Sequence, residues 1–141
     1  MQTIAILVAV AFAGLAILHI YWALGGKLDI KKVIPVANGD PVFTPGVLGT
    51  FAVAVALVCF AAVALALGFC GVISANYQPY LKFPGFAIGA VLIIRAIGEF
   101  RYVGFFKRVR GSDFSTYDSW IYSPFCLLAG GAFLLLAVSQ T

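Results

Sequence analysis

The chain has 141 residues, of which 63% are hydrophobic and 10% are charged, and its mean hydropathy is +1.08. Soluble domains carry about 25% charged residues, so this composition excludes a soluble protein and predicts an integral membrane protein. One histidine, three cysteines and five carboxylates are too few for most metal centres or hydrolytic triads within one chain. The sequence therefore identifies no cofactor or metal site, and a bis-histidine haem would need an oligomer.

Four apolar runs are long enough to cross a membrane. A bilayer core about 30 Å thick requires about 20 apolar helical residues, and runs of that length occur four times along the chain. They predict an all-α fold, a bundle of four transmembrane helices that occupies residues 1–141 as a single domain. The predicted spans cover residues 3–24, 47–72, 83–106 and 120–139.

The third span is the exception because charged residues interrupt it. A charge near the centre of a membrane helix costs about 2.5–3.5 kcal/mol on the insertion scale, so its polar side chains should face the bundle. Arg95, Glu99 and Tyr102 have the spacing i, i+4 and i+7 and would share one helix face. We expect Arg95 and Glu99 to form an ion pair, and Arg101 to extend to the near boundary.

Several helices deliver polar groups to the same half of the predicted bundle. With a rise of about 1.5 Å per residue, Arg95 lies near the midplane and Glu99 lies about 7 Å from it. His19, from the first span, lies about 8 Å to the same side. The sequence thus predicts one cavity, open to the cytoplasm, that holds water or a small polar or amphipathic ligand. Its predicted lining residues are His19, Arg95, Glu99, Tyr102 and Tyr122.

Three classes of function fit this convergence. The first is binding or transport of a small ligand or of protons, since an unperturbed histidine titrates near pH 6.5, roughly. The second is an accessory subunit of a larger membrane complex, in which the buried charges only fix the packing of the helices. The third is a membrane-embedded enzyme with Glu99 or His19 as general base, which we rank last because no nucleophile or cofactor motif accompanies them.

Two features near the ends of the spans are informative. Asp118 or Ser119 is expected to cap the fourth span, because the helix dipole favours an acidic group at a helix start. The connection over residues 25–46 is long for a helical bundle, in which about 2–8 residues are usual. It is either an amphipathic loop resting on lipid headgroups, which we favour, or a lid over the cytoplasmic mouth.

Small residues recur at helical spacing in two spans. Gly85 and Gly89 form a GxxxG pair, and Ala5, Ala9 and Ala13 repeat the same spacing. Such patterns predict close helix packing, either within the bundle or between protomers of a homo-oligomer. The expected partners are membrane lipids and further copies of the chain or a larger complex. Nucleic acid is excluded, because basic and aromatic residues do not interleave on one surface.

Several motifs resemble those of a known family. They are HIYWALGG at residues 19–26, GEFRYVGFFK at 98–107, FSTYD at 114–118 and YSP at 122–124. The chain is similar to small bacterial four-helix membrane proteins that are known only as a domain of unknown function. The resemblance covers essentially the whole chain and supports four spans. It implies no catalytic roles.

Lysine and arginine set the predicted orientation. Six basic residues lie in the loops after the first and third spans, whereas one lies on the opposite side. This distribution places both termini outside, in the inner membrane of a bacterial cell. The six are Lys27, Lys31, Lys32, Lys107, Arg108 and Arg110, and the seventh is Lys82.

Reporter fusions test this orientation. We expect a C-terminal alkaline phosphatase fusion to be active and a C-terminal green fluorescent fusion to be dark, because the six basic loop residues hold their side in the cytoplasm. An inactive phosphatase together with a fluorescent partner fusion would reverse the orientation.

Overall fold

The computed structural model describes residues 1–72 and 77–140. Within them the protein is mainly helical, and four helices are long and apolar enough to cross a membrane, which confirms the predicted fold class. The first two are α1 (Gln2–Ala23) and α3 (Val47–Gly68), close to the expected ranges. A short 3-10 turn, η1 (Cys70–Val72), follows α3.

The third helix differs from its predicted range. Helix α4 covers Gln78–Ile97, whereas the sequence predicted residues 83–106. It ends because Gly98 adopts φ 92°, a left-handed conformation that an ordinary side chain disfavours. Gly104 has φ 89°, and the two glycines touch so closely that a Cβ on Gly98 would overlap the Val103 carbonyl oxygen. Residues 98–112 therefore form a loop where a helix was expected.

The fourth helix begins earlier than predicted. Three consecutive elements, α5 (Asp113–Tyr117), the π-helical turn η2 (Asp118–Tyr122) and α6 (Ser123–Val138), form one continuous helix. Its N-cap is Ser112, whose Oγ accepts a hydrogen bond from the Ser115 N–H at 3.1 Å. The expectation that Asp118 or Ser119 caps this helix was wrong, because the helix continues through both.

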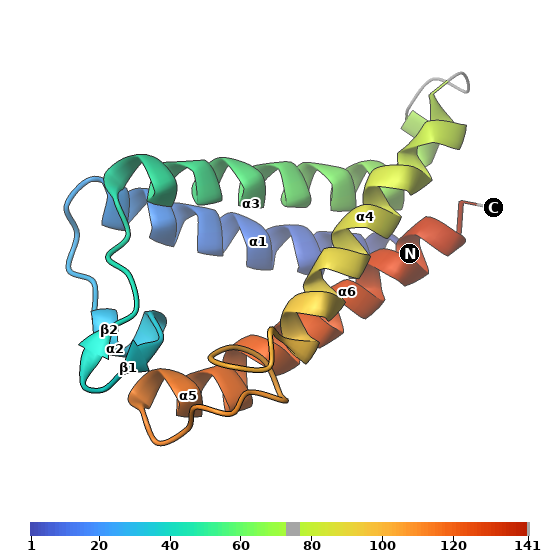
Figure 1. Cartoon of the computed structure of the whole chain (residues 1–141). Helices are drawn as coiled ribbons and strands as arrows, with labels where there is room; N and C mark the ends of the chain where they lie inside the picture. The colour runs from blue at the N-terminus through green and yellow to red at the C-terminus, as the bar shows by residue number, and fades with distance from the viewer. Residues whose placement is uncertain (73–76, 141) are drawn as a thin grey trace.

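The connection between α1 and α3 contains small elements. It holds a single helical turn, α2 (Ile30–Val33), and a two-stranded antiparallel hairpin, β1 (Val36–Ala37) with β2 (Asp40–Pro41). Helix α2 contacts α5, so the connection reaches the other half of the molecule. It lies beside the 98–112 loop at what we call the loop end of the protein (Figure 1).

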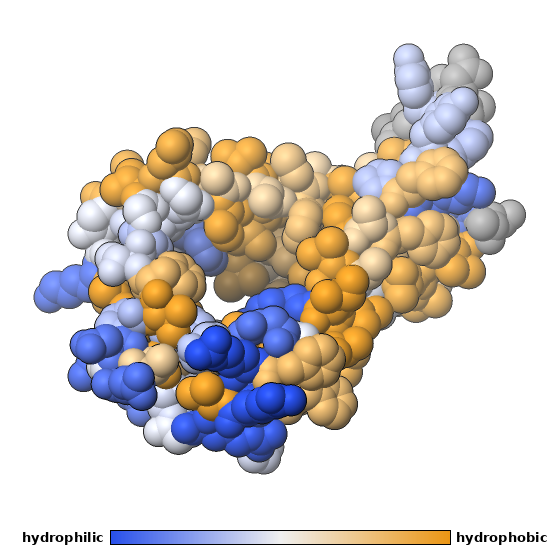
Figure 2. Space-filling view, in the orientation of Figure 1, coloured by the Kyte–Doolittle hydropathy of each residue, from blue (hydrophilic) through white to orange (hydrophobic). Residues whose placement is uncertain are grey.

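The spanning helices form two antiparallel pairs, α1 with α3 and α4 with α6. The contacts between the two pairs are less extensive than the contacts within each pair. Aromatic rings join the pairs, and the Phe12 ring centroid lies 5.9 Å from that of Phe133. Figure 1 shows that the pairs meet near the two chain termini and diverge toward the loop end. Hydrophobic residues cover the helices, and hydrophilic residues gather at the loop end (Figure 2), as a membrane-spanning protein requires.

The GxxxG pair of α4 lies inside the bundle. A Cβ on Gly85 would meet Leu67 and Ala137, and one on Gly89 would lie 3.1 Å from the Gly130 carbonyl oxygen. Of the two alternatives for this motif, the structure therefore shows packing within one chain. Glycine at these positions lets the backbones of α4 and α6 approach closely.

Two adjacent glycines of α6 provide a matched test of this packing. A Cβ on Gly130 would lie 2.8 Å from Ile93 Cγ1 and 3.0 Å from the Gly89 carbonyl oxygen, whereas one on Gly131 would meet no described residue within 4 Å. We expect Gly130→Ala to lower stability by about 1–3 kcal/mol through overpacking. Gly131→Ala should be neutral or stabilising by up to about 1 kcal/mol. Thermal unfolding in detergent measures both, and equal effects would contradict the close approach.

Candidate functional site

A buried carboxylate occupies the centre of the loop end. Asp118 lies in the π-helical turn, and its side chain is 0% exposed. Its Oδ1 accepts a hydrogen bond from Arg95 Nη2 at 2.8 Å, and its Oδ2 accepts bonds from Lys107 Nζ at 2.9 Å and the Gly104 N–H at 2.8 Å. One carboxylate thus joins the end of α4, the 98–112 loop and the fourth helix. We call these four residues the Asp118 cluster.

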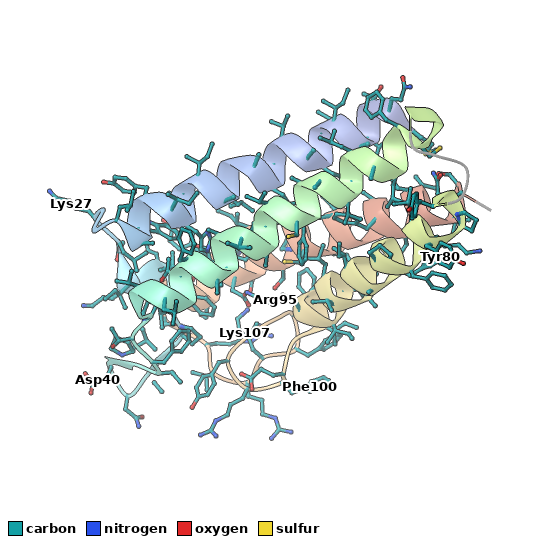
Figure 3. The ribbon with its side chains drawn as sticks, turned by 90° about the horizontal axis from the view of Figure 1, so that it is seen from above. Lys27, Asp40, Tyr80, Arg95, Phe100 and Lys107 are labelled. Carbon is teal, nitrogen blue, oxygen red and sulfur yellow. The ribbon has the colours of Figure 1, made fainter. Side chains whose placement is uncertain are left out.

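Lys107 is fully buried in this cluster. Besides Asp118, its ammonium group donates to the Gly104 carbonyl oxygen at 3.0 Å and to Ser119 Oγ at 2.7 Å. Its three hydrogens therefore all have acceptors, which is the condition for burying an ammonium group at acceptable cost. Figure 3 shows Lys107 beside Arg95, with the loop folded back against the helices.

The expected ion pair between Arg95 and Glu99 does not form. Helix α4 ends two residues after Arg95, so Glu99 is not on the next helical turn. Its Oε1 instead accepts a hydrogen bond from the Tyr102 N–H at 2.7 Å in an exposed position. The early helix end also corrects the depth of Arg95, which lies about 3 Å from the end of α4 and not at the midplane.

The Asp118 cluster carries excess positive charge. One carboxylate faces two cations, and Arg95 Nη1 is buried without a hydrogen-bond partner among the described residues. The Arg95 side chain as a whole is 33% exposed, so part of it is accessible at the surface of the protein. The cluster therefore keeps one net positive charge near the loop end of the membrane helices.

His19 lines a different feature, a cavity of about 470 Å³ at the loop end of α1 and α3. Its Nδ1 lies 2.8 Å from the Leu15 carbonyl oxygen. Because a carbonyl oxygen only accepts, Nδ1 must carry the hydrogen, which leaves Nε2 as the acceptor nitrogen of the neutral tautomer. The Trp22 ring packs edge-on against the imidazole, with 5.0 Å between centroids.

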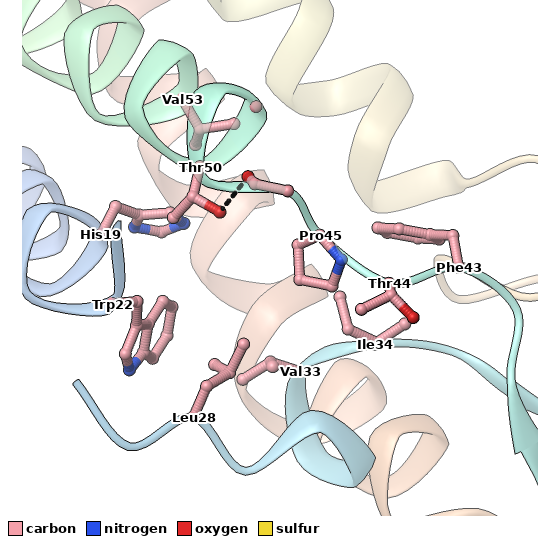
Figure 4. A pocket seen from close by; sticks show the side chains of 12 residues that line it. His19, Trp22, Leu28, Val33, Ile34, Phe43, Thr44, Pro45, Thr50 and Val53 are labelled. Atoms are coloured by element: carbon pink, nitrogen blue, oxygen red, sulfur yellow. Dashed lines mark hydrogen bonds between the residues drawn. The ribbon is translucent and has the colours of Figure 1, made fainter. Parts of the chain in front are cut away.

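The walls of this cavity come mostly from the 24–46 connection. Figure 4 shows His19 and Thr50 on the helical side, with the connection folded opposite them. Thr50 Oγ1 donates to the Gly46 carbonyl oxygen at 3.0 Å, and its lone pairs can still accept a hydrogen bond. Apart from these polar groups the walls are largely apolar, and they include Leu28, Val33, Ile34, Phe43, Pro45 and Val53.

A hydrogen bond ties this connection to the fourth helix. The Tyr122 hydroxyl donates to the Lys32 carbonyl oxygen at 3.2 Å, and the Tyr122 ring stacks on Tyr117 with 6.4 Å between centroids. The nearby Asp29 carboxylate accepts a hydrogen bond from the Lys32 ammonium group and raises the pKa of that lysine above its ordinary value. Tyr122 therefore acts as a tether for the cavity wall.

The structure distributes the five predicted site residues over several places. His19 lines the α1–α3 cavity, Arg95 belongs to the Asp118 cluster, and Tyr122 holds the connection. Glu99 lines an open cavity of about 480 Å³ on the 98–112 loop, and the Tyr102 ring lies 4.9 Å from the Arg101 guanidinium carbon. The five residues therefore do not line the single cavity that the sequence predicted. Their role in binding stays a prediction.

Sequence reasoning missed Asp118 and Lys107 as partners. Asp118 was expected as a helix cap, and Lys107 was counted only as a topology signal. The spacing of Gly98 and Gly104 within the GEFRYVGFFK motif could have indicated them, because glycine after an apolar helical run is a stop signal. A helix stop at residue 97 makes a long-range partner for Arg95 necessary.

The fold and its polar loop end define a small multi-pass membrane protein. Residues 12–133 match a family described as a protein of unknown function, DUF3995. The chain belongs to this family, which confirms the resemblance drawn from its motifs to a family without an established activity. No curated protein and no solved structure matches the chain. Among the described residues, no three His, Cys, Asp or Glu side chains are grouped so that they could hold a metal ion.

Charge removal tests the Asp118 cluster. Asp118→Asn keeps the size of the side chain but leaves Lys107 as a buried cation without a counter-charge, so we expect a loss of about 3–5 kcal/mol. The double variant Asp118→Leu with Lys107→Leu should lose less than the sum of its single substitutions, because it leaves one fewer unpaired charge. Thermal unfolding in detergent measures these losses.

Glu99→Gln is the matched control, since the amide oxygen can still accept from the Tyr102 N–H and the site is exposed. It should change stability by no more than about 0.5 kcal/mol. Equal losses for Asp118→Asn and Glu99→Gln would show that the buried cluster does not stabilise the fold.

Proposed function

We propose that this protein binds an amphipathic small molecule in the cavity at the loop end of α1 and α3, with a hydroxyl or amine group of the ligand donating to His19. The observation that carries the proposal is the hydrogen bond from His19 Nδ1 to the Leu15 carbonyl oxygen. It orients the imidazole so that an acceptor, Nε2, is available at the wall of an otherwise apolar cavity.

The size and lining of the cavity support this ligand class. Ligand sites commonly enclose about 300–1,000 Å³ and combine apolar walls with a few polar groups, and this cavity of about 470 Å³ has that character. His19 lies four residues before the end of α1, or about 6 Å along the helix axis. At that depth an amphipathic molecule can place its polar group near the headgroups and its apolar part among side chains.

The 24–46 connection serves as the cover of this site. Of the two interpretations open to sequence reasoning, its position over the cavity favours the lid. The Tyr122 tether holds the cover to the fourth helix, and the bond from the Val42 N–H to the Pro35 carbonyl oxygen, 2.8 Å long, holds the hairpin within the cover. With both termini outside, as the distribution of lysine and arginine indicates, the cavity opens toward the cytoplasm.

The accessory-subunit function rests on a different observation. In the Asp118 cluster every oxygen of the carboxylate and every hydrogen of the Lys107 ammonium group is used within the chain. This use of every donor and acceptor of Asp118 and Lys107 serves packing, and it supports a structural role for these two charges. It does not involve His19, so the two functions make different predictions for a His19 variant.

Tryptophan fluorescence tests the proposed ligand site. The chain has two tryptophans, so a Trp120→Phe background leaves only Trp22, which lines the cavity. A long-chain alcohol with a terminal bromine should quench Trp22 saturably in detergent solution. In the same background His19→Leu should weaken its apparent affinity about five-fold, the worth of one ordinary hydrogen bond.

Two controls make the result specific. The corresponding bromoalkane without the hydroxyl group should bind equally to both proteins, and Leu18→Ala, a substitution at an exposed neighbour of His19 outside the lining, should leave the alcohol affinity unchanged. Quenching that does not saturate, or an equal affinity of the alcohol in the His19 variant, would contradict the proposal and favour the accessory-subunit function.

A further inference from the structure

We infer that the 98–112 loop carries a second, independent site, in which Arg101 and Arg108 bind the phosphate of an anionic phospholipid beside Phe100 and Phe106. The two arginines line one open cavity of about 480 Å³. The backbone brings them together, because the Arg101 carbonyl oxygen accepts hydrogen bonds from the N–H groups of Arg108 at 3.2 Å and Val109 at 2.8 Å.

The charge of this site favours an anion. Glu99 is the one carboxylate among the lining residues, and its Oε1 already accepts from the Tyr102 N–H. Within the part of the chain that the structure describes, neither Arg101 nor Arg108 forms a salt bridge. Two exposed guanidinium groups against one carboxylate leave an excess positive charge, and guanidinium groups are well suited to phosphate oxygens.

The aromatic neighbours indicate a lipid as the source of the phosphate. Phe100 and Phe106 are 55% and 63% exposed, and their ring centroids lie 6.4 Å apart. Figure 3 shows Phe100 on the outer edge of the loop, away from α1. A soluble anion gains nothing from two exposed phenyl rings, whereas the glycerol backbone and first acyl carbons of a lipid pack on them.

The loop also has the right depth. Helix α4 has 20 residues, or about 30 Å, the thickness of the hydrocarbon core. The loop begins where this helix ends, which is the level of the headgroups. Aromatic and basic side chains together at that level are typical of interfacial lipid contacts.

The backbone shows that this surface is held in place. Gly104 and Lys107 anchor the loop to Asp118, so the arginines project from a rigid frame. Phe100 has φ 66°, a conformation that glycine adopts far more readily than a residue with a side chain. With this backbone conformation and an exposed side chain, phenylalanine at position 100 stabilises the fold less than glycine would. Contact of the phenyl ring with lipid accounts for the presence of phenylalanine there.

Lipid-dependent unfolding tests the inference with the full chain in detergent micelles. We expect dioleoyl phosphatidylglycerol at ten times its dissociation constant to raise the unfolding midpoint by about 5 °C, and dioleoyl phosphatidylcholine to raise it much less. The double variant Arg101→Gln with Arg108→Gln should lose this difference. The control variant Lys27→Gln with Lys31→Gln, which removes the same charge from exposed positions of the other loop, should keep it.

A second variant separates lipid contact from folding. Phe100→Gly should unfold at the same or a higher temperature without lipid, because glycine relieves the backbone strain, yet gain less from phosphatidylglycerol. If phosphatidylglycerol raises the unfolding midpoint of the arginine variant and of the lysine variant equally, its effect does not depend on Arg101 and Arg108 in particular. That result would overturn the site. A gain from soluble glycerol phosphate as large as that from the lipid would show a phosphate site without lipid contact and would also overturn it. Neither result depends on the His19 cavity.

Discussion

Burial of the Asp118 carboxylate determines the loop end of this protein. Moving an ion from water into a protein costs roughly several kcal/mol, even after the protein relaxes around it. This cost is offset only when opposite charges and hydrogen-bond donors surround the carboxylate. Here Arg95, Lys107 and the Gly104 N–H surround it. Because two of the three come from the segment after α4, that segment must fold back over the fourth helix. The position of the whole 98–112 loop follows from this requirement.

The same requirement distinguishes the buried charges, which stabilise the fold, from the exposed charges, which can bind a ligand. Asp118 and Lys107 have side chains that are 0% exposed, and their polar atoms are used by each other and by neighbours within the chain, so they serve the fold. Arg101 and Arg108 project from the loop that the cluster holds, and their guanidinium groups stay exposed. A rigid inner cluster thus presents a charged outer surface. Charged residues of one small region therefore differ in role according to their burial: the buried ones hold the loop, and the exposed ones form its surface.

The arrangement of the helices also keeps the two proposed sites apart. The α1–α3 pair and the α4–α6 pair pack together near the termini and diverge at the loop end (Figure 1). Each pair therefore has its own polar end, with the His19 cavity on the first and the arginine surface on the second. The Tyr122 hydroxyl bridges them through the Lys32 carbonyl oxygen. The Lys32 ammonium group over the Tyr117 ring, 6.0 Å from its centroid, adds a second contact between them.

Hydropathy alone determined the membrane class, the four spans and nearly the full extent of α1 and α3, because transfer into a bilayer is a local property of about 20 consecutive residues. Local sequence also contained the helix stop at Gly98, although the apolar residues beyond it concealed the stop. The partner of Arg95 was decided by tertiary structure. Glu99 is four residues away and Asp118 is 23 residues away, but a left-handed glycine removes the first from reach and the folded loop brings in the second. Spacing along a helix predicts a contact only while the helix continues.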